Sequence, residues 1–345
     1  MILDPSNPED RELFYKVARR VRENYDSSIF SLWSDSLNLE EIAQSKEKQL
    51  KIFGKEGGRV AVFKLSESLG AIGWYECSDD DVLSTELLSW ACDELRAMGV
   101  KSIIGPINGS TWYNYRFNLS SSKPMFGGEP HQPHYYVNQW ERFGFEISEN
   151  YKTNVSELEK DLYPNLQELE DELATKGLIL KKFTAEVNNR YVEAFYNLVT
   201  TSFRGNKAYS AISKDDYERF SANYPKVLDQ DHSFVVFDND IPIAFIGCIQ
   251  DLFRPFYLKS TAEDPIYSEE KLIIKTLVVH PDWQSKGVGA LLVKAAMRSA
   301  VDDGIYKVIH ALMHEDNLSA IGGKRMFGTS SKSKYALFKL KIDGE

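Results

Sequence analysis

The chain has 345 residues, 43% of them apolar, and a formal net charge of −10. This length exceeds the usual size of one domain and predicts two domains with separate cores, and the aromatic-rich apolar fraction excludes a disordered chain. The acidic balance excludes nonspecific nucleic-acid binding, which needs a basic surface. No apolar run has membrane-spanning length, and the first residues lack a basic region followed by an apolar one, so we expect a cytoplasmic protein without nucleic-acid or membrane partners.

The cysteines and histidines do not form metal-binding patterns. Cys77, Cys92 and Cys248 are widely separated and show no CxxC spacing, which predicts packed thiols in a reducing compartment. His131 and His134 lie near each other in "EPHQPHYY", but the flanking prolines indicate a rigid loop. We therefore expect no metal site.

In the first half, one stretch predicts a strand, a loop, a helix and a second strand. It reads "LGAIGWYECSDDDVLSTELLSWACDELRAMGVKSIIGP". The next segment, "GPINGSTWYNYRF", gathers amide, hydroxyl, aromatic and guanidinium groups after a strand end: Asn108, Ser110, Trp112, Tyr113 and Arg116. These groups could shape an acceptor pocket, or the aromatic residues could pin a loop to the core.

A polar, charged stretch between residues 146 and 182 separates the two halves. Pro164 suits a helix start and Gly177 a helix stop, which predicts one helix between them. We therefore predict one domain over residues 1–155 and a second over residues 165–345.

The second half predicts helices, then antiparallel strands, then a strand, helix and strand. "SFVVFDND" and "IPIAFIGCIQD" indicate two strands joined by a turn at Asn239 and Asp240. The predicted helices cover residues 188–202, 214–227 and 288–302, and further strands cover residues 272–279 and 307–313. A short helical stretch from about Asn317 and a final strand, "KYALFKLKI", end the chain. This order predicts an α/β fold with a mixed sheet and a right-handed crossover.

The two halves share one layout. The spacing from Leu88 to Gly99 is within a residue of that from Leu292 to Gly304. Such short apolar matches also arise by chance, so this spacing by itself only suggests a duplicated domain.

A glycine-containing loop, "QSKGVGA", precedes the helix over residues 288–302. Glycines leave backbone N–H groups accessible, and these groups at a helix start form an anion site. The phosphate-binding Walker pattern GxxxxGK[ST] is absent, and GxGxxG lacks its third glycine because position 292 is Leu. By itself the loop is only a tight turn from strand to helix.

The wider pattern "LVVHPDWQSKGVGALLV" is more specific. A strand ending in V-x-P, followed by Q-x-x-G-x-G/A, resembles the acyl-CoA motif of the GCN5-related N-acetyltransferase (GNAT) superfamily. The specific part runs from Leu277 to Val293, and the element order extends the resemblance over about residues 178–342. The resemblance implies two acyl-CoA N-acyltransferase-like domains in tandem, with acetyl-CoA as cosubstrate.

The resemblance also implies the cofactor-binding residues. Backbone amides of the loop would bind the pyrophosphate: Gln284, Ser285, Lys286, Gly287, Val288, Gly289 and Ala290. The strand would bind the pantetheine arm through Leu277, Val278 and Val279, and an amide near Leu277 would polarise the thioester carbonyl. Asn317 stands where the family places an asparagine that contacts the cofactor.

The chain departs from the family at the expected acid and base. Many members have a tyrosine seven residues after that asparagine, where this chain has Lys324, and a glutamate general base is also missing before the V-x-P strand. The remaining candidates are Tyr335 as an acid, or else a packed sheet residue, and His310 and His314, whose ordinary pKa suits proton transfer near neutrality.

The first half has "SDDD" at the equivalent loop. Three aspartates would repel a pyrophosphate, so we predict a degenerate acetyltransferase-like domain that binds no acyl-CoA. Together these features predict an N-acetyltransferase in which an amine of a small molecule or peptide attacks the thioester directly. The alternatives are a non-catalytic acyl-CoA-binding or sensor protein, and a transferase that uses a long acyl chain or aminoacyl-tRNA. The sequence does not predict the acceptor or the oligomeric state.

Overall fold

The computed structural model describes residues 1–22, 39, 49–120, 126–159, 162–206, 208–249, 269–316 and 330–342. The chain divides into two compact units. Unit 1 contains Met1–Pro124, Pro130–Tyr151 and Ser333–Glu345, and unit 2 contains Met125–Glu129 and Lys152–Lys332. Among the helices described, none combines the length and the apolar character that a membrane crossing requires.

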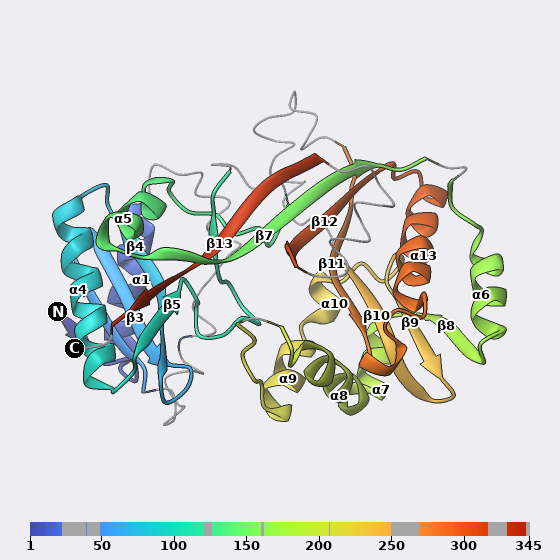
Figure 1. Cartoon of the computed structure of the whole chain (residues 1–345), viewed down its shortest axis with the longest axis horizontal. Coiled ribbons are helices and arrows are strands. Elements are labelled where there is room, and N and C mark those ends of the chain that lie inside the picture. The colour runs from blue at the N-terminus through green and yellow to red at the C-terminus, as the bar shows by residue number, and fades with distance from the viewer. Residues whose placement is uncertain are drawn as a thin grey trace. The chain divides into compact units, whose positions relative to one another are not determined.

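Unit 1 is a sheet covered by helices (Figure 1). Its elements in chain order are β1 (Ile2–Leu3), α1 (Pro8–Val21), β2 (Lys51–Lys55), β3 (Gly58–Lys64), β4 (Leu69–Cys77), α4 (Asp81–Ala97), β5 (Ser102–Gly105), β6 (Phe117–Asn118), α5 (Tyr135–Phe143) and the first half of β7 (Glu146–Glu157). The strand order is β1-β2-β3-β4-β5-β13, with β4 and β5 parallel. A parallel pair needs a crossover, and α4 supplies it.

The core of unit 1 lies between this sheet and the helices α4 and α5. Leu87, Leu88 and Leu95 of α4 and Trp140 of α5 are fully buried in one apolar cluster. Burying each of these leucine side chains contributes roughly 1.5–3 kcal/mol. Gly99 follows α4 at φ +81°, a left-handed conformation that favours glycine.

The last strand of the chain completes the sheet of unit 1. β13 (Ser330–Lys341) pairs antiparallel with β5, with Phe338 opposite Gly105 and Lys341 opposite Ser102. The predicted second domain, residues 165–345, therefore differs from unit 2, because residues 333–345 belong to unit 1. The apolar pattern of "KYALFKLKI" predicts the strand, but the edge that it pairs with depends on tertiary structure.

Unit 2 is a mixed sheet between two helical layers (Figure 1). Its elements are the second half of β7, α6 (Leu166–Ala174), β8 (Leu178–Lys182), α7 (Ala185–Arg190), α8 (Val192–Phe203), α9 (Lys214–Ser221), α10 (Tyr224–Val227), β9 (Phe234–Asp238), β10 (Ile241–Ile249), β11 (Leu272–Val279), the 3-10 turn η2 (Pro281–Trp283), α13 (Val288–Asp302) and β12 (Lys307–His314). The strand order is β7-β12-β11-β10-β9-β8. β11 and β12 are parallel, whereas β10 pairs antiparallel with β11 and β9, and β9 pairs antiparallel with β8. The predicted mixed sheet with a crossover helix is confirmed.

Alternation along β10 assigns the helices to opposite faces of this sheet. Ala244 and Ile246 pack in the cluster that contains α13 and α6. Phe245, between them, points to the other face, where its ring lies 5.7 Å from Phe195 of α8 and 4.9 Å from Phe183. The face of α13 and the face of α8 are therefore distinct.

Candidate functional site

The parallel strands β11 and β12 pair only at their starts. Their pairs are Leu272 with Val308, Ile273 with Ile309 and Ile274 with His310. β11 nevertheless continues to Val279 and β12 to His314, and these residues, all of them described, form no further pairs with one another. The two strands thus separate at a fixed point, and beyond it one edge of β11 is no longer bonded to β12.

A β-bulge in β11 lies at this point. Gly247 of β10 pairs with Thr276 and the next residue, Cys248, pairs with Ile274, so Lys275 is the extra residue. A bulge bends its strand and increases the local twist. The bulge at Lys275 therefore explains why β11 leaves β12 directly after Ile274.

Beyond the bulge, the backbone of β11 has a defined direction. The His280 N–H donates to the Ile243 carbonyl at 2.8 Å, so it points toward β10. Because N–H groups alternate along an antiparallel strand, those of Leu277 and Val279 point away from β10, to the edge that β12 has left. This edge can bind an extended ligand in the manner of an added strand.

The start of α13 adds an anion site next to this edge. Gly287 is its N-cap at φ +86° and, as glycine, has no side chain to bond the amides of this helix start. The first-turn N–H groups, together with the positive end of the helix dipole, favour a phosphate. Gly289 allows the helix to approach the strand, because a Cβ at this position would lie 3.2 Å from Cγ2 of Val279.

The loop between β11 and α13 is held by its own polar groups. The Gln284 side-chain amide donates to the Val279 carbonyl at 3.1 Å, and the Gln284 backbone N–H donates to the Pro281 carbonyl at 3.2 Å. The Gln284 amide, predicted to bind pyrophosphate, thus closes the turn, and the available run of amides begins at Ser285. Lys286 places its ammonium 4.9 Å from the centre of the Trp283 ring, on the same loop.

The structure brings two of the three predicted catalytic residues to β12. His310 is in the last pair before the strands separate, and burial lowers its pKa to about 4. His314, at the end of β12, is half-buried, and its Nδ1 accepts the Asp316 N–H at 3.2 Å. Tyr335 instead lies in unit 1, where it is fully buried opposite Asn118. Asn317 and Lys324 lie outside the described residues.

Unit 1 has the same arrangement at β4 and β5. These strands pair only from Leu69 to Ala71, and β4 contains an extra residue near Trp74, which has φ +48°. Here, however, the chain itself occupies the separation. The Ile107 N–H donates to the Ile72 carbonyl at 2.9 Å, and Asn108 Oδ1 accepts the Trp74 N–H at 2.7 Å. Of the two interpretations of "GPINGSTWYNYRF", these bonds favour a structural loop.

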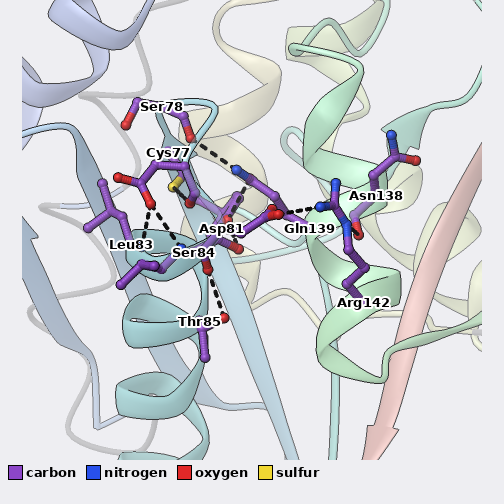
Figure 2. Close-up of polar contacts among 12 residues, drawn as sticks. Cys77, Ser78, Asp81, Leu83, Ser84, Thr85, Asn138, Gln139 and Arg142 are labelled. Carbon is purple, nitrogen blue, oxygen red and sulfur yellow. Dashed lines mark hydrogen bonds and ion pairs between the residues drawn. The ribbon is translucent and has the colours of Figure 1, made fainter.

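Side chains of α5 occupy the end of β4 (Figure 2). The Gln139 amide donates to the Ser78 carbonyl at 3.0 Å. The Tyr135 hydroxyl donates to the Cys77 carbonyl at 3.1 Å. Arg142 forms an ion pair with Asp81. The groups that would face a cofactor in unit 1 are thus bonded within the unit.

The helix start of unit 1 is also closed. Asp80 is the N-cap of α4, and its Oδ1 accepts the N–H groups of Val82 at 2.9 Å and Leu83 at 3.0 Å. The matching amides at the start of α13 have no such cap. A carboxylate at the α4 position both uses the donors and repels an anion.

Comparison with known proteins identifies the second unit. The sequence model of the "Acetyltransferase (GNAT) family" matches residues 192–323. Residues 192–323 form a GNAT domain. The match contains β11, the loop and α13, so the separated edge and the uncapped helix start belong to this domain. No curated protein sequence matched the chain.

Solved structures of low sequence identity share the fold. A GCN5-related N-acetyltransferase from Anabaena variabilis ATCC 29413 is 10% identical, covers 99% of this chain and 73% of its own, and has a TM-score of 0.57. One from Sphaerobacter thermophilus is 12% identical, covers 100% and 96%, and has a TM-score of 0.52. A tandem GNAT protein from the clavulanic acid biosynthesis pathway is 10% identical, covers 87% and 85%, and has a TM-score of 0.48. The first two relate the fold of the whole chain to GNAT proteins.

Proposed function

We propose that the GNAT domain transfers an acetyl or longer acyl group from acyl-CoA to a primary amine, and that acetyl-CoA is the first donor to test. The observation that carries this proposal is the edge of β11 that separates from β12 and leads to the start of α13, where no side chain caps the helix. An extended pantetheine arm needs such an edge, and a pyrophosphate needs such a helix start.

Each residue of this site would have a defined role. The amides from Ser285 to Ala290 would bind the pyrophosphate, and the Lys286 ammonium would add positive charge. The Leu277 N–H, directed away from β10, would donate to the thioester carbonyl, where negative charge grows as the amine attacks. The same amide binds the substrate less strongly than the transition state, which is the condition for catalysis.

Removal of a proton from the attacking amine would not require a strong base. With a pKa of about 4, His310 is neutral near pH 7 and is a weak acceptor for an ammonium proton. The amine would therefore bind in its neutral form, and the alignment of amine and thioester would supply much of the acceleration. His314, at the end of β12, would be the candidate proton acceptor.

Calorimetric titration of the full chain with acetyl-CoA and with longer acyl-CoAs tests this proposal. We expect one binding site per chain, and the preferred donor then enters a screen of primary amines followed by thiol release. An absence of binding to every donor would reject the proposed function. Binding without thiol release for any amine would favour the sensor interpretation.

A further inference from the structure

The geometry of unit 2 restricts the direction from which an acceptor reaches the proposed reaction centre. α13 packs on one face of β11 and β12, where its Val288 and Leu292 share one buried apolar cluster with Leu272, Ile274 and Val308. That face is filled where the strands separate. An amine that attacks a thioester held along the edge of β11 must approach from the opposite face.

A short segment from the first half of the sequence lies on that opposite face. Met125–Glu129 belongs to unit 2, although the residues on both sides of it belong to unit 1. Phe126 is fully buried and packs against Ile273 of β11 and against Ile309 and Ala311 of β12. These partners alternate with the residues that face α13, so Phe126 covers the other face at the last paired residues.

The bulged residue of β11 contacts the same segment. The Lys275 ammonium donates to the Gly128 carbonyl at 3.4 Å, and it lies 5.8 Å from the centre of the Phe126 ring. The segment itself is a closed turn, because the Glu129 N–H donates to the Phe126 carbonyl at 3.3 Å and Gly128 has φ +96°. Glu129 is only 3% exposed. The turn is thus fixed directly beside the bulge that separates the strands.

We propose that Phe126–Glu129, together with Lys275, forms the acceptor-side wall of the reaction centre in unit 2. The segment lies outside the residues matched by the GNAT family model, so the selection of the acceptor by the GNAT domain depends on the first half of the sequence. This assigns a role to the half whose own cofactor position is closed. The inference rests on the proposed function.

Affinity labelling tests the wall without a known acceptor. In the Lys275→Cys variant, we expect bromoacetyl-CoA to alkylate the introduced thiol, whose sulfur displaces bromide from the carbon next to the thioester carbonyl. Lys181→Cys, on the edge strand β8, is the matched control because Lys181 is exposed. Proximity should make labelling at position 275 at least about 100-fold faster than at position 181. Excess CoA should block only the labelling at position 275.

The outcomes separate the two proposals. If CoA binds but the thiol at position 275 reacts no faster than the thiol at position 181, the wall is rejected and the proposed function stands. If CoA fails to bind the unmodified protein, the proposed function is rejected, and the wall with it. The native thiols do not confuse the assay, since Cys77, Cys92 and Cys248 are all buried.

A kinetic comparison provides a second, independent test. Phe126→Leu shortens the wall and keeps its apolar character, and Phe145→Leu makes the same change in the buried core of unit 1. With the best amine from the screen, Phe126→Leu should change the KM for the amine or the turnover rate by about tenfold, while the Kd for CoA stays within about twofold. Equal effects of the two variants would reject the wall. If no amine is acylated, the labelling result decides.

Discussion

Replacing Gly287 by valine tests the cofactor loop most directly. At φ +86° a residue with a Cβ is strained by about 1–2 kcal/mol. The space itself is open, because the nearest atom to a Cβ at this position, Nζ of Lys176, is 3.9 Å away. The strain should lower Tm by roughly 2–8 °C.

The larger effect should be on CoA binding. Valine at this position either shifts the first-turn amides of α13 or places methyl groups beside them. Losing one hydrogen bond to a charged phosphate costs about 1.5–3 kcal/mol. The affinity for CoA, measured by calorimetry, should therefore fall by roughly 10- to 100-fold.

Gly304→Val is the matched control. Gly304 follows the other end of α13, at φ +81°, and no atom lies within 4 Å of a Cβ there. The backbone strain is thus the same, but this end of the helix has no anion site. We expect a similar decrease in Tm with unchanged affinity for CoA. If both variants lose affinity equally, or if Gly287→Val retains full affinity, the assignment of the loop is wrong.

Three further predictions concern stoichiometry and pH. Because Asp80 and α5 close the cofactor position of unit 1, titration with CoA should give one site per chain, and two sites would contradict that closure. In unit 2, burial by itself would lower the pKa of His232, but Asp229 at 2.9 Å and Asp303 at 3.2 Å outweigh it and raise the pKa. The charged form should therefore stabilise the fold fully below about pH 6.5 and lose this effect as the pH rises through the raised pKa. His232→Gln should lower the free energy of unfolding by about 1–3 kcal/mol at pH 6 and by less in alkaline buffer. A difference in urea unfolding that does not change with pH would reject this account. Because burial lowers the pKa of His310 to about 4, the pH dependence of acyl transfer between pH 5 and 8 should follow the ionisation of the acceptor amine. An inflection near pH 6.5 that disappears in His310→Gln would overturn this assignment.

The sequence predicted much of unit 2 because the relevant signals are local. Alternating apolar residues and the turn at Asn239 and Asp240 predicted β9 and β10, and the glycines at 287 and 289 predicted a turn into a helix. The backbone angle of Gly287 favours glycine there, and the close approach at Gly289 favours a small residue. Such preferences act within a few residues and are therefore visible in one sequence.

The candidate catalytic residues were only partly predictable. The sequence places His310 on a strand, but its low pKa depends on burial by residues distant in the chain. Tyr335 is near the expected position in sequence, yet β13 pairs with β5, which places it in unit 1. The roles of these residues remain predictions.

Strand partners and the use of short segments were decided by tertiary structure alone. Nothing in "KYALFKLKI" identifies β5 as its neighbour, and no motif marks Phe126 as part of unit 2. The Leu312 N–H similarly donates to Thr153 Oγ1 at 3.1 Å, a contact across 159 residues of chain. The sequence by itself determined the local elements and the glycine-containing turn into α13, because backbone angles and apolar periodicity act locally. The tertiary structure decided which strand ends separate and what covers them, because pairing and burial depend on residues far apart in sequence.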